Sequence, residues 1–243
     1  MSAYYPWIGR ESPCLPGAGP LALRPDITNI EAMARKSTPA PPVVSAAASA
    51  PAAASVGPWL TGQALIAMPS LAGSSFARSV IYMCAHTADG AMGIVLNQPL
   101  ASPSFEGLLK TLGVAPLPPA RSIRLHSGGP VDNGRGFVLH TTDWTGDGSL
   151  RVDGRLALTA SLDILKAIAE GGGPEQGLLA LGYAGWGPGQ LDREMQENAW
   201  LSVALTHEDI GLVFDSDHDS KWQRALGRLG VNPVLLSVTG GRA

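Results

Sequence analysis

The side chains best suited to chemistry or recognition are concentrated in residues 178–201 of this 243-residue chain, with a few polar positions before them. Aromatic rings and side-chain amides dominate the set, joined by one arginine and one histidine, and they favour recognition over proton transfer. We therefore predict a ligand- or partner-binding surface made of Asn97, Arg135, His140, Tyr183, Trp186, Gln190 and Asn198. Residues of these types would equally tie the turns of a small sheet together, and both interpretations stay open.

The segment Gly185-Trp-Gly-Pro-Gly189 invites comparison with phosphate-binding turns, because it lies between a predicted strand and a predicted helix. A helix N-terminus offers unpaired N–H groups and a partial positive charge to an anion. The dinucleotide fingerprint, however, requires a glycine where this chain has Gln190, and Asp192 and Glu194 would bring negative charge close to a phosphate. The pattern favours a structural turn that lets Trp186 pack. Binding of a small anion or ligand is the second interpretation, and nucleotide binding is the third.

Two further patterns approach a catalytic or metal-binding template without completing it. Cys84 and His86 are two apart on a predicted strand, where side chains share a face, but their apolar neighbours indicate a buried thiol rather than a nucleophile. The segment Asp215-Ser-Asp-His-Asp219 alternates carboxylates as a calcium loop does. Its sixth position is Ser220 instead of glycine and its twelfth is Leu226 instead of glutamate, so we predict a turn that caps the next helix.

His126 and His140 flank a glycine turn and raise the question of zinc. Neither a cysteine nor a third ligand lies close to them in the sequence, so we predict no metal site. The chain also lacks the G-x-S-x-G motif of serine hydrolases and the G-x-x-x-x-G-K-[ST] motif of phosphate-binding loops. We therefore assign no catalytic residue and expect no cofactor.

The elements that must position these residues follow from the hydrophobic pattern. Apolar runs bounded by turn residues predict strands, and one-face apolar spacing predicts helices. Strands are expected at 63–68, 78–86, 92–97, 123–126, 136–140, 149–152, 156–159, 178–184 and from 200; helices are expected at 104–112, at 161–170, after 189 and at 220–229; short apolar segments occupy 210–214 and 234–238. Strands paired by turns outnumber strands that alternate with helices, which favours an α+β fold over a doubly wound sheet.

Composition divides the chain into an arm and a domain. Residues 39–58 consist almost wholly of Pro, Ala, Ser and Val, which are too poor in large side chains to offset the entropy of ordering. We predict that residues 1–57 form a disordered Pro/Ala/Ser-rich N-terminal arm and that residues 58–243 form a single domain. Met33 is an alternative start of the protein.

The charge and the cysteine content bear on partners and location. The domain carries 13 Lys and Arg against 17 Asp and Glu, a net charge of −4, which matches a nucleic-acid backbone poorly. Cys14 and Cys84 lie in unlike settings, so we predict no disulfide and a cytoplasmic location. No apolar run reaches the length of a membrane span, and we expect no membrane association.

Several long motifs resemble the YqgE/AlgH family of bacterial proteins, and they occur in the same order across nearly all of residues 60–243. The matching segments are GQALIAMPSL at 62–71, RSVIYMCAH at 78–86, GAMGIVLNQP at 90–99, GGPVDNGRGFVLH at 128–140, LTASLDIL at 158–165 and LGYAGWGPGQLDREMQENAWL at 181–201. The resemblance implies a compact α+β domain with a coiled, partly bifurcated and mostly antiparallel sheet and flanking helices. It does not cover the long N-terminal arm.

The family is largely uncharacterised, and some members are described as transcriptional regulators. Together with the residues above, this implies a non-enzymatic binding or regulatory protein that acts through a protein partner or a small ligand. The alternative is an enzyme of unrecognised class that uses the Tyr183/Trp186/Gln190 surface. Direct DNA binding ranks third, because no helix-turn-helix is evident and the net charge is unfavourable.

Overall fold

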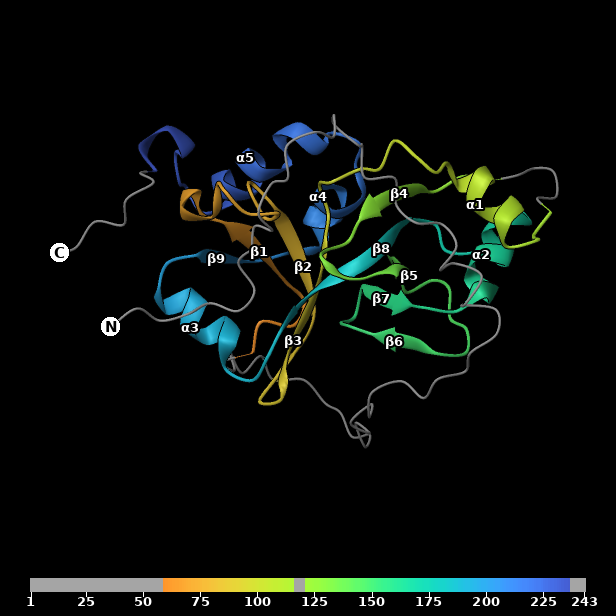
Figure 1. Cartoon of the computed structure of the whole chain (residues 1–243), viewed down its shortest axis with the longest axis horizontal. Coiled ribbons are helices and arrows are strands. Elements are labelled where there is room, and N and C mark those ends of the chain that lie inside the picture. Colours follow the sequence, from red (N-terminus) through yellow and green to blue (C-terminus); the bar gives the residue numbers. More distant parts are fainter. Residues whose placement is uncertain (1–58, 116–120, 237–243) are drawn as a thin grey trace, which may run out of the picture.

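A computed structural model describes residues 59–115 and 121–236 of the chain, and it is built on one large curled sheet (Figure 1). The strands are β1 (Gln63–Ala67), β2 (Val80–Thr87), β3 (Gly90–Val95), β4 (Arg124–Ser127), β5 (Val131–Thr141), β6 (Ser149–Arg151), β7 (Leu156–Thr159), β8 (Gly177–Trp186) and β9 (Trp200–Ala204). Their order is β6-β7-β5-β8-β3-β2-β1-β9, with β4 paired to β8 outside this path. Every pair is antiparallel except β4–β8, so the predicted α+β class with a mostly antiparallel sheet is confirmed.

Five α-helices and three short 3₁₀ turns accompany the sheet in the described part of the chain. The α-helices are α1 (Phe105–Thr111), α2 (Leu162–Ala169), α3 (Gln190–Gln196), α4 (Ile210–Phe214) and α5 (His218–Arg228); the 3₁₀ turns are η2 (Pro69–Leu71), η3 (His207–Asp209) and η4 (Pro233–Leu235). Ser104 and Asp217 cap α1 and α5 by accepting hydrogen bonds from backbone N–H groups in the first turn. The capping turn predicted for 215–219 is therefore confirmed. None of these helices is long and apolar enough to cross a membrane.

Strand β8 is the branch point of the sheet. Its first half lies between β4 and β5, and its last three residues pair with β3. Strands β4 and β3 therefore pair with successive stretches of β8. The turn after β4 presses against this branch. A Cβ atom on Gly129, whose φ is 148°, would lie 2.2 Å from the carbonyl carbon of Tyr183, and one on Gly128 would lie 2.2 Å from the carbonyl oxygen of Gly182. Only glycine permits this approach, which produces the bifurcation that the family resemblance implies.

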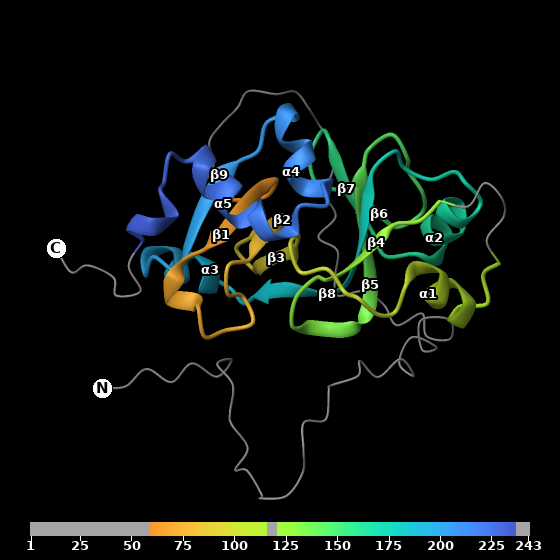
Figure 2. The same ribbon diagram turned by 90° about the horizontal axis from the view of Figure 1, so that it is seen from above.

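Two halves of the molecule meet along β8 (Figure 2). One half holds β1, β2, β3 and β9 with α3, α4 and α5, and the other holds β4, β5, β6 and β7 with α1 and α2. The strand residues alternate between apolar layers: Ala64 and Ile66 of β1 pack in the layer that contains Trp222 of α5, whereas Leu65 packs with Trp200 on the other face. A third layer joins α1 and α2 to β4, β5 and β8. Both faces of the central strands are covered, which explains their continuous apolar sequences.

The turn between β6 and β7 clasps the far end of the curled sheet. Arg155 donates from Nη1 to the backbone oxygen of Leu205 at 2.7 Å, and the Tyr82 hydroxyl donates to Oδ2 of Asp153 at 3.0 Å. Arg155 and Asp153 also form an ion pair at 2.7 Å. These contacts hold the β6–β7 end of the sheet close to its β1–β9 end, so the sheet forms a half-barrel.

Several strands differ in extent from the sequence prediction. β3 (Gly90–Val95) begins and ends two residues before the predicted strand at 92–97. β8 continues to Trp186, into the segment predicted as a turn, because Ala184–Trp186 pair with β3. β5 begins at Val131, five residues before the predicted start, and its register with β8 shifts between Val131 and Gly136. The predicted arm at 1–57 and the end of the apolar segment at 234–238 lie outside the described residues, and 233–235 form η4.

Candidate functional site

The segment predicted to carry recognition folds into a corner that is closed around Glu194. The carboxylate oxygen Oε2 accepts hydrogen bonds from the indole N–H of Trp186 at 2.9 Å and of Trp200 at 2.8 Å, and Oε1 accepts one from the Gln190 amide at 2.8 Å. Gln190 also accepts from the backbone N–H of Gly187 at 3.0 Å. The ring of Trp186 is 7% exposed and packs on Phe76 and Trp200. The polar groups of this corner bond to one another.

The structure brings only some of the seven predicted binding residues together. Trp186 and Gln190 meet at Glu194, while Tyr183 and Arg135 both contact the ring of Phe137 at centroid distances of 5.7 and 5.1 Å. No side-chain contact joins the remaining three residues to these groups in the described part of the chain. Asn97 bonds to the backbone of Val80 and Arg78, His140 is fully buried, and Asn198 sits at the end of α3 with a φ of 57°. Ligand or partner binding by this set stays a prediction.

His140 belongs to a buried chain of hydrogen bonds. Its Nδ1–H donates to the backbone oxygen of Thr141, so Nε2 accepts from the Thr159 hydroxyl, which in turn accepts from Ser149 at 2.7 Å. Burial lowers the pKa of His140, and the ring packs edge-on against Trp144. This histidine ties β5 to the β6–β7 hairpin.

Cys84 and His86 lie on opposite faces of the sheet and do not form a catalytic pair. The register of β2 with β3 shifts between Met83 and Ala85, and this irregularity breaks the alternation that would have placed both side chains on one face. Cys84 is 2% exposed in the layer that contains Trp222, and burial raises the pKa of its thiol. His86 faces α3, with Nε2 3.8 Å from a carboxylate oxygen of Asp192.

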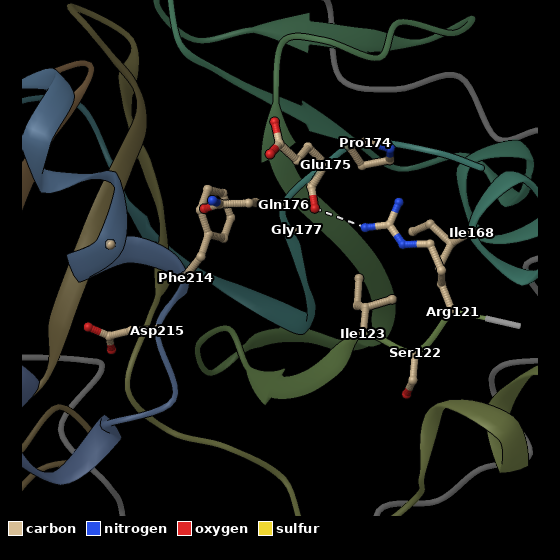
Figure 3. Close-up of a pocket in the computed structure, with 11 residues that line it drawn as sticks. Arg121, Ser122, Ile123, Ile168, Pro174, Glu175, Gln176, Gly177, Phe214 and Asp215 are labelled. Atoms are coloured by element: carbon tan, nitrogen blue, oxygen red, sulfur yellow. Dashed lines mark hydrogen bonds between the residues drawn. The ribbon is translucent and has the colours of Figure 1, made fainter. Parts of the chain in front are cut away.

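A groove runs between the two halves of the molecule, beside the segment that leads into β4. It consists of three adjoining hollows of about 380 Å³ each. Ile123 lines all three, and Phe214 and Asp215 line two of them. Figure 3 shows one of these hollows, with Phe214 and Asp215, from the end of α4, on one side and Arg121 and Ile123 on the other. We call this site the interlobe groove; β4, the start of β8 and α2 line it from one half of the molecule, and α4 and the start of α5 line it from the other.

His126 of β4 lines the interlobe groove and has unsatisfied hydrogen-bonding capacity. Its side chain is 2% exposed, and neither ring nitrogen has a hydrogen-bond partner among the described residues. The ring packs edge-on against that of His218, at a centroid distance of 4.9 Å, and the guanidinium of Arg124 donates to Nε2 of His218 at 3.3 Å. Burial, together with the proximity of His218, Lys221 and Arg124, lowers the pKa of His126 to about 4, so the ring is neutral near pH 7. The backbone of Arg124 lies near the ring without hydrogen-bond geometry and acts weakly in the opposite direction.

The wall opposite β4 is formed by the junction of α4 and α5. Asp215 pairs with Arg224 at 2.6 Å and with the fully buried Lys221 at 3.2 Å. Burial alone would raise the pKa of Asp215, but the two cations outweigh it and the pKa lies below its usual range. Lys221 also donates to the backbone oxygens of Leu212 and Val213, the last carbonyls of α4. The ion pairs hold this wall together, while Oδ1 of Asp215 and Nδ1 of His218 have no hydrogen-bond partner among the described residues.

The sequence suggests His126 only as a zinc ligand beside His140, and His218 only as part of a calcium-like loop. The fold separates His126 from His140 and packs it against His218, which is far away in the sequence. Arg124, on the same strand as His126, bonds to His218 across 94 positions. No group of three His, Cys, Asp or Glu side chains within residues 59–115 and 121–236 is arranged to hold a metal ion. Glu194, which organises the Trp186 corner, was not among the predicted residues. Its spacing from Gln190, one helical turn, was the available signal.

Comparison with known proteins gives consistent matches. The model of the AlgH-like family (DUF179) matches residues 64–234. A UPF0301 protein of Rhodospirillum rubrum is 51% identical over 185 residues, which cover 76% of this chain and 95% of that protein. A UPF0301 protein of Gluconobacter oxydans is 50% identical over 186 residues, which cover 76% of this chain and 98% of that protein.

Solved structures show the same similarity. The solution structure of the AlgH protein from Pseudomonas aeruginosa matches with a TM-score of 0.61 and 41% identity, over 78% of this chain and 98% of that chain. A crystal structure of a Corynebacterium diphtheriae protein matches with a TM-score of 0.53 and 22% identity, over 70% of this chain and 86% of that chain; this match concerns the fold alone.

Proposed function

The chain belongs to the AlgH-like family, and from that premise we propose that it is a non-enzymatic binding or regulatory protein whose binding site is the interlobe groove. The observation that carries the proposal is His126, a buried histidine that lines the groove and has no hydrogen-bond partner in the described part of the chain. Buried polar groups are nearly always hydrogen-bonded, so such a ring calls for a partner from outside the fold. The protein would act through a small ligand or a protein partner that occupies the groove.

The state of the ionisable groups around the groove supports binding over catalysis. A general base must titrate near the working pH, whereas the pKa of His126 is about 4. Asp215 is engaged by Arg224 and Lys221. Cys84 is buried away from the groove, with its thiol pKa raised by burial. The alternative enzyme site at Tyr183, Trp186 and Gln190 has less support, because Trp186 and Gln190 are bonded to Glu194.

A regulatory role in transcription would run through a partner rather than through DNA contact, given the net charge of −4 on residues 59–243. The proposal includes a cytoplasmic location. The free, buried Cys84 is consistent with a reducing compartment.

The proposal is tested by NMR of the full-length protein against a library of bacterial metabolites. We expect amide shifts at Ile123, Gly177 and Phe214, and we expect the variant Phe214→Arg, which fills the groove, to lose them. Leu150→Arg is the matched control, because it adds the same side chain at an exposed position on the edge strand β6. Amide shifts centred on Trp186 instead would show that the ligand binds at the surface predicted from the sequence, around Tyr183, Trp186 and Gln190. A complete absence of shifts would contradict a small-ligand function.

A further inference from the structure

This inference rests on the proposed function and names the ligand class of the interlobe groove. We propose that the groove binds a small organic acid with an apolar body, with its carboxylate held by Arg124 and the ring of His126. Arg124 is exposed at the start of β4, and His126 lies two residues later on the same strand. Because side chains two apart on a strand point to the same face, Arg124 and His126 can both bind one group of a ligand.

The two residues offer suitable donors for a carboxylate. A neutral imidazole carries one N–H donor, and in His126 neither nitrogen has a partner among the described residues. Arg124 donates to His218, and no other hydrogen bond or ion pair of its guanidinium is found within the described ranges. A guanidinium has five N–H groups in a planar fork that matches the two oxygens of a carboxylate. A single carboxylate can therefore accept from both residues.

The charges around His126 favour an anion over a cation. Among the cations near His126, Lys221 is already paired with Asp215, whereas Arg124 of β4 has no carboxylate partner among the described residues. On the facing wall, Asp215 is engaged in ion pairs with Arg224 and Lys221. A negative group that enters beside Arg124 is therefore attracted, whereas an ammonium group would be repelled.

The remaining lining favours a carboxylate with an apolar body over inorganic phosphate. Ile123, Leu178, Val213 and Phe214 line the hollow beside His126. The adjoining hollow extends past Ile168 and Pro174 (Figure 3). Ser122 and Ser216 also line the hollow beside His126, so the apolar contact for a ligand body comes mainly from Ile123, Phe214 and the adjoining hollow. These apolar side chains gain from burying hydrocarbon, which inorganic phosphate lacks.

A dianion would also need a second strong cation at the site. Arg121 is the nearby candidate, but its guanidinium already donates to the backbone oxygens of Gly172 at 3.0 Å and of Glu175 at 2.9 Å; the dashed line in Figure 3 marks the bond to Glu175. This arginine secures the wall of the groove. The guanidinium of Arg124 and the neutral ring of His126 together offer one positive charge, which matches a ligand with one negative charge.

The test is a titration of the full-length protein with hexanoate, acetate, hexylamine, hexanol and inorganic phosphate at pH 7, followed by calorimetry and by the ring signals of His126. We expect hexanoate to bind and to shift the His126 ring signals. Acetate should bind about tenfold more weakly or worse, because it lacks the apolar body. Hexylamine should not bind, and hexanol should bind more weakly than hexanoate.

The variant Arg124→Gln should weaken hexanoate binding about tenfold or more, since it removes a charge-assisted hydrogen bond. Arg124 is exposed, so its replacement leaves the core intact. The matched control is Arg151→Gln, which removes an exposed arginine from β6 and should leave binding unchanged. His126→Phe tests the second donor, with its fold verified by its amide spectrum, and it should weaken hexanoate and leave the affinity for hexanol unchanged.

Several results would overturn the inference. Tighter binding of phosphate than of hexanoate would show that the groove prefers another oxyanion to a carboxylate. Equal binding of hexanoate and hexylamine would show that the charge of the ligand does not determine binding. Failure of hexanoate while a metabolite still shifts Ile123 and Phe214 would overturn the ligand class and leave the proposed function standing. Hexanoate binding at the Trp186 corner, with no response from the groove, would overturn both.

Discussion

Glu194 illustrates how one carboxylate can organise a set of aromatic side chains. It accepts from two indole N–H groups and from the amide of Gln190, so three donors on α3, β8 and β9 converge on one residue. Buried indoles need such a partner, because an unpaired N–H away from water is costly. The corner that the sequence marks as a recognition surface therefore has a structural reason for its composition as well.

The variant Glu194→Ala should lower the free energy of unfolding by about 2–4 kcal/mol, since it leaves two largely buried indole N–H groups unpaired. Urea denaturation, followed by tryptophan fluorescence and by circular dichroism, measures this. Glu170→Ala, at an exposed position after α2, should change stability by less than about 0.5 kcal/mol. A Glu194→Ala protein as stable as the wild type would show that water replaces the carboxylate.

At the scale of elements, the branch of the sheet at β8 depends on glycine. Gly129 has a φ of 148°, and a Cβ atom there would lie 2.2–2.4 Å from backbone atoms of Tyr183 and Ala184. Backbone atoms in a paired strand cannot move aside cheaply, so the turn after β4 can rest on β8 only without a side chain.

We expect Gly129→Ala to destabilise the protein by about 3 kcal/mol or more, or to prevent folding, because it combines a backbone clash with an unfavourable φ. Gly227→Ala provides the opposite case. Gly227 lies in α5 with nothing within 4 Å of its added Cβ, and alanine there should stabilise the protein by about 0.5–1 kcal/mol. Thermal unfolding of both variants measures the contrast. A Gly129→Ala protein that melts with the wild type would show that the branch can relax.

The short helix α4 ends on a buried ammonium group. Lys221 donates to the backbone oxygens of Leu212 and Val213 at 2.6 and 3.2 Å, and it pairs with Asp215. A cation at a helix C-terminus complements the unpaired carbonyls and the helix dipole. Burial lowers the pKa of Lys221, while Asp215 opposes this shift and favours the charged form.

Replacement of Lys221 by methionine should cost about 3 kcal/mol of stability, because it leaves the carbonyls of α4 and the carboxylate of Asp215 without their cation. Hydrogen exchange should become faster at Phe214 and Asp215, which form a wall of the interlobe groove. Lys166→Met, at an exposed position in α2, is the control. Unchanged hydrogen exchange at the end of α4 would show that the ion pair between Arg224 and Asp215 is enough to hold α4 against α5.

At the scale of the whole molecule, the curled sheet is held closed by a clasp that contains a carboxylate. Asp153 accepts from the Tyr82 hydroxyl, from Arg155 and from two backbone N–H groups. Burial alone would raise the pKa of Asp153, but the hydrogen bonds and the charge of Arg155 outweigh it and lower the pKa. The folded state therefore binds a proton at Asp153 less readily than the unfolded state does.

A lowered pKa stabilises the fold above the unfolded value of about 3.9, and this contribution is lost as the pH falls through the folded value. We expect Asp153→Asn to be less stable than the wild type at pH 7, with a smaller difference at pH 3. Urea denaturation at pH 7, 5, 4 and 3 measures this. Asp163→Asn, which removes an exposed carboxylate from α2, should show no such trend. Parallel curves for wild type and Asp153→Asn would show that the clasp carries no proton linkage.

The sequence by itself determined the kinds of element and the class of fold. The strands around Val80 and Ile94 and the helices that contain Leu165 and Trp222 were predicted from apolar spacing, because burial of one face imposes a period that neighbouring residues reveal. The motifs from 62 to 201 also indicated the family, which the comparisons confirm. These properties depend on residues close together in the chain.

Only the tertiary structure decided which side chains meet. His126 and His218 became neighbours because β4 pairs with β8 while α5 packs on β1 and β2 and begins beside β4. Cys84 and His86, two apart, were separated by an irregular register that local spacing does not predict. A site depends on contacts between distant segments, and those contacts are set by sheet pairing and core packing rather than by the local pattern.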